Sequence, residues 1–436
     1  MDPDTNFCPV EIKGPKLAFR MFLTTIMALS MVVLSLLSTP SVQSSAASAW
    51  PMFHGNAQHT GLSPFPGPSV PFLRWTFQTG GPVYSPPAVG RGRMYVGSYD
   101  GNLYALNLQG VLLWKFQTHS PIITTPAIGS DGTIYLASHT RCIEQPCYGA
   151  LYAINPGGRM IWNLTILALQ GPALSSPTIG PDGTIYTSQL GFRTYAVNPD
   201  GTVKWQLTTN GEVFDSPAVA PDGTLYVGVD DPDPSESCDQ CLLALNSDGT
   251  VRWSAIPKRA GFSWPAIGSD GTVYINGYAI NPDGTVKWQN PGTFGSPSIG
   301  PDGAIYGAGE DVVNSINPDG ALRWQFPIER PSGSGNPCCF YGIVGLSSMA
   351  IGSNGILYFG VGVEGFCNCA PVPSGYGNAS LYAVAPNGTL AWKFVIHPTV
   401  TCDAFVCPIA LLSDPAIGSD GTIYIGSGDG NLYAIG

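Results

Sequence analysis

Paired cysteines are the residues of this sequence with the most obvious chemistry. Of 11 cysteines, Cys8 alone precedes residue 50, which leaves ten. Close pairs of thiols form disulfides, or bind zinc or carry redox chemistry where a Cys-x-x-Cys motif is repeated or accompanied by histidines. Cys238-Asp-Gln-Cys241 has neither companion, so we favour disulfide chemistry for it. The ten residues are Cys142, Cys147, Cys238, Cys241, Cys338, Cys339, Cys367, Cys369, Cys402 and Cys407.

Clustered carboxylates form a second candidate site between residues 230 and 239. Carboxylate oxygens are the ligands that calcium prefers, but its common loop motif also needs a glycine for a sharp turn. This segment has interleaved prolines and no such glycine, so we expect a solvated acidic loop rather than a calcium site. The acidic residues are Asp230, Asp231, Asp233, Glu236 and Asp239.

The overall charge excludes two classes of partner. The 436 residues include 18 Lys and Arg against 29 Asp and Glu, a net charge of −11, and no basic run occurs. Binding to nucleic acid or to an anionic membrane surface needs basic residues, so we expect neither. Abundant glycine (55) and proline (40) together with 11% aromatic residues indicate many short strands joined by tight turns.

The N-terminus has the pattern of an export signal. Three basic residues lie within 1–20, residues 21–37 carry no charge, and Ala47-Ser48-Ala49 follows a Ser/Ala-rich stretch. This order is typical of a signal peptide cleaved after Ala49. The alternative is a short membrane anchor that is retained. In both cases we expect residues 50–436 outside the membrane, in a secreted, periplasmic or cell-surface location where cysteines form disulfides.

The remaining chain repeats one unit eight times. Each unit has a Gly followed three residues later by Tyr, and ends with a Trp-bearing segment. Residues 176–207 show the pattern, which divides into four short strands, here named A to D, with Asp-Gly turns between A and B and between C and D. Such repeats predict an all-β fold, an eight-bladed β-propeller of four-stranded antiparallel blades. The repeated tryptophans are Trp75, Trp114, Trp162, Trp205, Trp253, Trp288, Trp324 and Trp392.

The two ends of the repeat region predict how the ring closes. The last unit stops after strand C at Gly436, while residues 72–77 around Trp75 form a strand D without a blade. Pairing the two completes the eighth blade and removes an exposed edge. We therefore divide the chain into a signal (1–49), a lead-in (50–71) that packs near this seam, and the propeller (72–436). Deleting 50–78 should open the ring, whereas trimming 50–60 should matter much less.

Strand order assigns the connections to two faces. The A–B and C–D turns share one face and are short, whereas the B–C and D–A connections share the other and contain every long insertion. All ten cysteines lie in these insertions, a distribution typical of functional loops on a rigid scaffold, or of long loops that need disulfides for order. We predict Cys142–Cys147 and Cys402–Cys407 disulfides, which non-reducing peptide mapping can check.

The repeat resembles that of the pyrroloquinoline-quinone-type propellers. The resemblance rests on Leu-Tyr-Ala-Ile-Asn-Pro-Asp-Gly-Thr-Val-Lys-Trp-like segments and on the lead-in WPMFHGNAQHTG at 50–61. Some members of that superfamily are quinone-dependent dehydrogenases, whereas others bind no cofactor, including an outer-membrane assembly lipoprotein. The tryptophan-docking motif of the enzymes is one residue shorter here, with Asn198 in place of Asp, although the spacing from Gly201 to Trp205 is kept. The resemblance implies that each Trp covers a seam between blades.

The resemblance also implies a test for quinone chemistry. Such enzymes hold an adjacent-cysteine disulfide against the quinone, and Cys338-Cys339 could supply one, although separate disulfides to Cys367 and Cys369 are equally compatible. They also need a calcium site and a carboxylate base. The strand A positions expected to face the channel are mostly Ser-Pro or Thr-Pro, and the nearby carboxylates are Asp414, Asp215 and Glu329.

We therefore expect a monomeric, non-catalytic propeller without cofactor or metal. It would bind a protein or small-molecule ligand through the face with long loops. A dehydrogenase using the quinone with calcium is the first alternative. A carbohydrate-binding or carbohydrate-cleaving propeller is the second, because Tyr341, Phe366 and Tyr376 lie in the loops, and cleavage would require two carboxylates across the channel. His54 and His59 are placed in the lead-in, away from the channel.

Overall fold

The computed structural model describes most of the chain from Ser48 to the C-terminus. The described ranges are 48–138, 147–168, 174–189, 192–209, 211–213, 216–230, 240–255, 263–290, 296–309, 311–328, 339–367, 379–396 and 411–436. Within them, only the backbone is described for 147–148, 167–168, 230, 240–241, 339–344 and 363–367.

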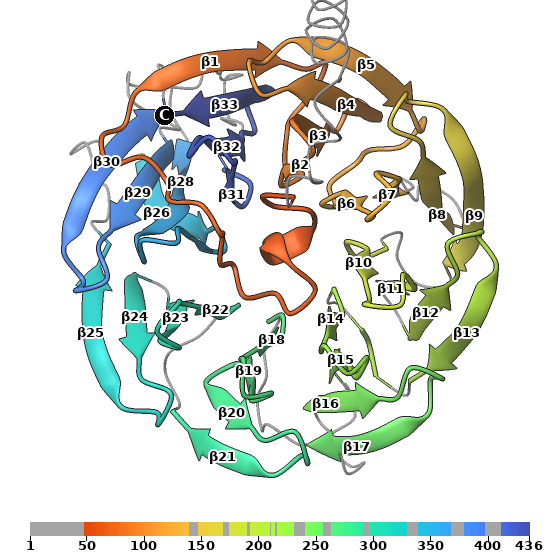
Figure 1. Ribbon diagram of the computed structural model, residues 1–436. Helices are drawn as coiled ribbons and strands as arrows, with labels where there is room; N and C mark the ends of the chain where they lie inside the picture. The colour runs from red at the N-terminus through yellow and green to blue at the C-terminus, as the bar shows by residue number, and fades with distance from the viewer. Residues whose placement is uncertain are drawn as a thin grey trace, which may run out of the picture. The chain divides into compact units, whose positions relative to one another are not determined.

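Eight antiparallel sheets are arranged in a ring, so the all-β, eight-bladed propeller is confirmed (Figure 1). Each blade has an inner strand A next to the axis and an outer strand D at the rim. Strand A is short and almost fully buried, while strand D alternates between exposed and partly buried side chains. The alternation follows from the two-residue period of a strand, which turns every second side chain of strand D to solvent.

The strands of the first four blades, each in the order A to D, are as follows: β2 (Ala88–Gly90), β3 (Arg93–Gly97), β4 (Asn102–Asn107) and β5 (Leu112–Gln117); β6 (Ala127–Ile128), β7 (Ile134–Ser138), β8 (Cys147–Ile154) and β9 (Met160–Ala168); β10 (Thr178–Ile179), β11 (Ile185–Gln189), β12 (Arg193–Val197) and β13 (Val203–Thr208); β14 (Ala218–Val219), β15 (Leu225–Asp230), β16 (Gln240–Leu245) and β17 (Val251–Ala255).

The strands of the last four blades are as follows: β18 (Ala266–Ile267), β19 (Val273–Ile275), β20 (Tyr278–Ile280) and β21 (Val286–Gln289); β22 (Ser298–Ile299), β23 (Ile305–Ala308), β24 (Val312–Ile316) and β25 (Leu322–Pro327); β27 (Ala350–Ile351), β28 (Leu357–Cys367), β29 (Ala379–Val384) and β30 (Leu390–Ile396), with the additional β26 (Cys339–Leu346); β31 (Ala416–Ile417), β32 (Ile423–Gly426) and β33 (Asn431–Ile435), completed by β1 (Leu73–Gln78). The 3-10 helix η1 (Phe53–Gly55) precedes them all.

The Asp-Gly turns form because each supplies both a side-chain cap and a positive φ. In the third blade, Asp182 Oδ1 accepts a hydrogen bond from the Thr184 backbone N–H at 3.0 Å, and Gly183 has φ +83°. Glycine adopts this conformation without the steric cost of a Cβ. Lys204 on the neighbouring strand D then places its Nζ 3.0 Å from Asp182 Oδ2.

Seven of the eight repeated tryptophans bridge the seam to the next blade. Trp162 Nε1 donates a hydrogen bond to the carbonyl of Pro199 at 2.8 Å, and its ring centroid lies 5.9 Å from that of Tyr135 in its own blade. A Cβ on Gly201 would lie 2.8 Å from the Trp162 ring, so the glycine allows the indole to approach the next blade's turn. Seven of the tryptophans contact a turn in this way, and Trp392 instead donates to the carbonyl of Pro68 in the lead-in.

Two glycine-to-alanine substitutions should distinguish the cost of backbone strain in a turn from the cost of a steric clash with a seam tryptophan. Gly223 has φ +85°, and a Cβ there would make only an ordinary van der Waals contact with Ser247 Cβ at 3.8 Å, so we expect Gly223→Ala to lower the free energy of unfolding by about 1–2 kcal/mol. Gly201, at φ +90°, adds the contact with Trp162, and Gly201→Ala should cost a further ~1–3 kcal/mol. Denaturant titration of both variants measures the difference, and equal losses would show that the indole contact is unimportant.

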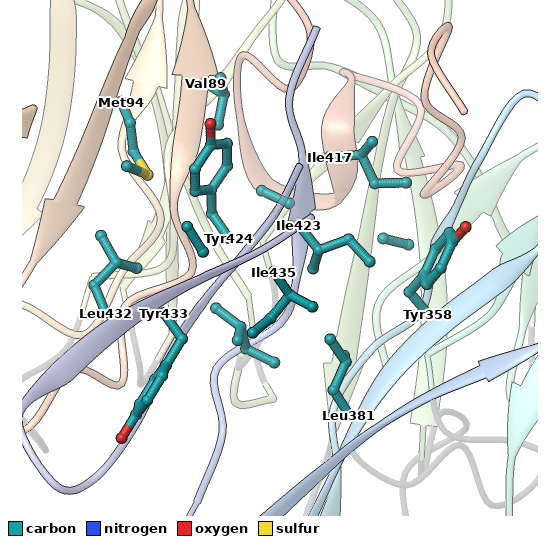
Figure 2. Packing of buried hydrophobic residues seen from close by; sticks show 14 of the residues in the cluster. Val89, Met94, Tyr358, Leu381, Ile417, Ile423, Tyr424, Leu432, Tyr433 and Ile435 are labelled. Atoms are coloured by element: carbon teal, nitrogen blue, oxygen red, sulfur yellow. The ribbon is translucent and has the colours of Figure 1, made fainter. Parts of the chain in front are cut away.

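The N-terminal strand closes the ring, as predicted. β1 pairs antiparallel with β33, with Leu73 opposite Ile435 and Phe77 opposite Leu432. Figure 2 shows the buried side chains around this eighth blade, where Tyr424, Leu432 and Ile435 belong to a cluster that also includes residues of the seventh and first blades. The closing blade is therefore held by a continuous apolar core on both sides.

The face with the B–C and D–A connections, here called the loop face, is elaborated by regular structure as well as by loops. β28 extends to Cys367 and pairs with β26, which lies in a segment that the sequence assigned to a D–A loop. The seventh blade thus has five strands. Backbone hydrogen bonding stabilises this part of the insertion, which composition alone did not indicate.

Candidate functional site

The lead-in lies inside the ring, along the axis, rather than only beside the closing seam. Its η1 helix occupies the centre of the view in Figure 1. Lead-in carbonyls accept hydrogen bonds from inner-strand N–H groups of six blades. These donor–acceptor pairs are Val89–Trp50, Ile128–Pro51, Val219–Ala57, Ile267–Gln58, Ile299–Thr60 and Ile351–Gly61, at 2.7–2.9 Å.

This arrangement argues against the expectation that trimming residues 50–60 matters much less than deleting 50–78. Strand A of each blade is the inner edge of its sheet, and its N–H groups would otherwise face an open channel without partners. Only the later part of the lead-in lies at the seam, where the carbonyl of Pro68 accepts hydrogen bonds from Tyr358 Oη and Trp392 Nε1.

His54 and His59 are buried in the channel, so their placement away from it was wrong. They are 3% and 0% exposed, and both have positive φ, at 51° and 56°. Phe53 stacks on His54 with ring centroids 4.9 Å apart and meets His59 edge-on at 5.1 Å. His59 Nε2 lies 3.2 Å from Thr178 Oγ1 and so links the lead-in to the third blade.

Hydrogen bonding and burial keep both imidazoles neutral. His54 Nδ1 lies 3.1 Å from the carbonyl oxygen of His59; because a carbonyl only accepts, Nδ1 carries the proton and Nε2 the lone pair. Burial lowers the pKa of His54, against the opposing effect of the Asp414 charge. Burial, with a smaller contribution from His54, lowers the pKa of His59 to about 3.

A cavity of about 310 Å³ lies at the loop-face end of the channel, with Phe53 of the lead-in among its lining residues. Its wall is built from the D–A ends of successive blades, where most repeats place Ser-Pro or Thr-Pro. At the residue two before strand A, five blades have Ser or Thr, whereas Pro86, Trp264 and Asp414 stand there in the other three. The remaining lining residues are Tyr84, Pro86, Ile123, Thr124, Thr125, Leu174, Ser175, Ser176, Ser216, Leu412 and Ser413.

Most polar groups of this wall are fixed by the backbone. Ser348 N–H donates to Asp414 Oδ1 at 2.7 Å, and Ser176 Oγ accepts from the Thr125 N–H at 3.0 Å. Four buried atoms in or near the channel have no hydrogen-bond partner among the described residues: Thr125 Oγ1 in the cavity lining, His54 Nε2 and His59 Nδ1 in the lead-in, and Ser263 Oγ next to Trp264. Asp414 belongs to none of the ion pairs found in the described part of the chain.

The cysteine side chains lie outside the description. Four of them have a described backbone position, and the register of β26 and β28 places Cys339 opposite Cys367. Cys241 lies opposite Val229, and Cys147 lies opposite Ala168. Cys142, Cys238, Cys338, Cys369, Cys402 and Cys407 are outside the described residues, so the predicted disulfides stay predictions.

The other candidate ligands are mostly outside the described residues too. Asp215, Glu329 and Tyr376 are not described, and neither is the acidic segment after Asp230. Of the carboxylates proposed to face the channel, Asp414 is the one that the description places at the cavity. Within the described ranges, no three His, Cys, Asp or Glu residues are grouped as a metal ion would require.

The described residues include no helix of the length and apolar character that a membrane-crossing segment needs.

The comparisons with known proteins agree with this architecture. The family described as outer membrane protein assembly factor BamB matches residues 72–189, 148–290 and 192–350. BamB from Moraxella catarrhalis has a similar structure, with a TM-score of 0.57 and 14% identity over 84% of this chain and 99% of that one. A quinohemoprotein alcohol dehydrogenase from Comamonas testosteroni is similar with a TM-score of 0.54 and 13% identity, over 88% and 80%. No curated protein matches by sequence.

Proposed function

Because the chain belongs to the family of the outer membrane protein assembly factor BamB, we propose that it is an exported, non-catalytic propeller that binds a partner protein through its loop face. The asymmetry between the two faces carries this proposal. On the opposite face, Asp and Asn side chains cap their own short turns, as Asp182 does for Thr184. On the loop face, the paired strands β26 and β28 extend the seventh blade and offer surface that the fold itself does not require.

The filled channel supports a binding role over a catalytic one. A propeller that acts on a substrate along its axis needs access to that axis, and here backbone hydrogen bonds from six blades hold the lead-in there. What stays accessible is the cavity at the loop-face end, with one charged residue in its described lining. The loop face therefore combines the insertions and the cavity, as binding surfaces on rigid scaffolds do.

A photo-cross-linking amino acid placed on either face tests the proposal. Tyr99 is 42% exposed in a B–C turn on the loop face, and Gln109 is exposed in a C–D turn of the same blade on the opposite face. In cells, we expect a discrete cross-linked protein from position 99 and none from position 109. Equal cross-linking from both positions, or none from either, would contradict binding through the loop face.

A quinone-dependent dehydrogenase is the second candidate, favoured by the fold shared with the alcohol dehydrogenase. Pyrroloquinoline quinone is a polycarboxylate, so a site for it needs basic side chains or a bound cation. The described lining of the cavity contains one carboxylate, Asp414, and no Lys or Arg. These residues do not fit the quinone, and we propose that none is bound.

Reconstitution checks this second candidate. The full chain is incubated with pyrroloquinoline quinone and calcium, and dye reduction is measured with alcohols and sugars. We expect no reduction above that of free quinone. Saturable dye reduction that a chelator abolishes would establish the dehydrogenase instead.

A further inference from the structure

We propose that the cavity at the loop-face end of the channel binds a small organic molecule with a primary ammonium group and an apolar body. Asp414 would receive the charge, and the rings of Phe53, Tyr84 and Trp264 would surround the apolar part. This goes beyond the proposed function, because binding in the cavity needs no partner protein. Its volume of about 310 Å³ is at the lower end of the range for ligand pockets.

Asp414 gives the described cavity wall its negative charge. It occupies a position that holds Ser or Thr in most other blades, so the carboxylate is not required by the repeat. Ser348 N–H satisfies one of its oxygens, while none of the described ion pairs includes it. A partly buried carboxylate attracts cations more strongly than an exposed one, because solvent screens it less, and the described lining of the cavity includes no basic residue to neutralise Asp414.

Buried acceptors favour an ammonium over other cations. Thr125 Oγ1 lines the cavity, is fully buried and has no partner among the described residues. His54 is not among the lining residues, but it lies close enough to Asp414 for that charge to act on its imidazole, and its Nε2 also has no partner among the described residues. A primary ammonium has three N–H donors and can satisfy several acceptors at once. Calcium, by contrast, requires about 6–8 oxygen ligands, more carboxylate than this wall supplies.

The aromatic residues complete the match to an organic cation. The Trp264 ring lies 5.2 Å from the Phe53 ring, and Trp264, like Asp414, replaces the usual Ser or Thr before the proline. Cations bind over aromatic faces within about 6 Å, and tryptophan is the most favourable. Trp264 and Asp414 therefore both make the cavity more suitable for a cation with an apolar body.

Calorimetric titration of the full chain with phenethylamine tests the inference. We expect saturable binding at neutral pH, and at least tenfold weaker binding of phenethyl alcohol and phenylacetate, which match its shape without the positive charge. Asp414→Asn should weaken binding of phenethylamine about tenfold or more. A tenfold loss of affinity corresponds to about 1.4 kcal/mol, the size of a modest charge interaction. Asp200→Asn, in an exposed turn on the opposite face, should change nothing.

The comparison of ligands on the unmodified protein keeps the test valid if Asp414→Asn does not fold. Equal affinity for phenethylamine and phenethyl alcohol would overturn the inference, as would no saturable binding of the amine. A titration with Nα-acetyl-lysine methylamide then identifies the source of the ammonium. Tighter binding than phenethylamine would assign the cavity to a lysine side chain, contradicting a free small amine. The cross-linking result at position 99 bears only on the proposed function.

Discussion

Deletion of residues 50–63 should remove most of the stability of the propeller, although no strand of any blade is lost. Inner-strand N–H groups of six blades donate to this segment, and each such hydrogen bond contributes about 0.5–1.5 kcal/mol net relative to water in an opened channel. Trp50, 2% exposed in the core cluster of the first and last blades, adds about 3–5 kcal/mol for its lost burial. A domain has only ~5–15 kcal/mol in total.

Thermal unfolding measured by circular dichroism checks this prediction, with rescue in trans as its control. A synthetic peptide of residues 50–66 should raise the melting temperature of the deleted protein, whereas a scrambled peptide of the same composition should not. If the deleted and intact proteins have the same melting temperature, the lead-in contributes no stability and the propeller is stable with an open channel.

Acidification below pH 6.5 should destabilise the protein through its buried histidines. Unfolded histidine titrates near 6.5, whereas the folded pKa of His59 is lowered to about 3, mainly by burial. Between these values the unfolded chain binds a proton that the folded chain does not, so stability falls as the pH falls through this window. For His59, the loss by pH 5 is about 2 kcal/mol. The lowered pKa of His54 acts in the same direction.

Denaturant titrations at pH 7.5 and pH 5 measure this effect. His59→Gln keeps a side-chain nitrogen toward Thr178 and should reduce the difference between the two pH values by about 2 kcal/mol. His119→Gln, at an exposed position, should leave the difference unchanged. The carboxylates with lowered pKa, such as Asp182, lose their contribution only below their ordinary value of 3.8, outside this interval. A pH dependence that survives His59→Gln intact would refute the assignment.

The sequence predicted the ring because the repeat consists of particular side chains at fixed spacings. Tyr186 and Trp205 mark the third blade by their spacing alone, and Trp75 without a blade identified the strand that closes the ring. Asp414 was also recognised, from its place before a proline where other blades have Ser or Thr. Trp264 departs from the repeat at the same position but carries no charge, so it was not predicted as a site residue.

The position of the lead-in could not be read in this way. Its carbonyls accept hydrogen bonds from the backbone N–H groups of Val219, Ile267 and other inner-strand residues. Almost every residue type can make such backbone hydrogen bonds, so they do not restrict the amino-acid sequence. His54 and His59 therefore looked unrelated to the channel that they fill. The extra strand β26 was missed for a similar reason, since its pairing with β28 is a property of the backbone.

The pairing of β1 with β33 has a consequence for the order of events during folding. Leu73 can pair with Ile435 only after every intervening residue has been synthesised, so the eighth blade cannot form before β33 is present. Contacts this distant in sequence slow folding and prolong the exposure of apolar strands. Until residues 431–435 have been synthesised, the growing chain has an unpaired edge that can aggregate, and a chaperone that shields nascent chains would act in this interval.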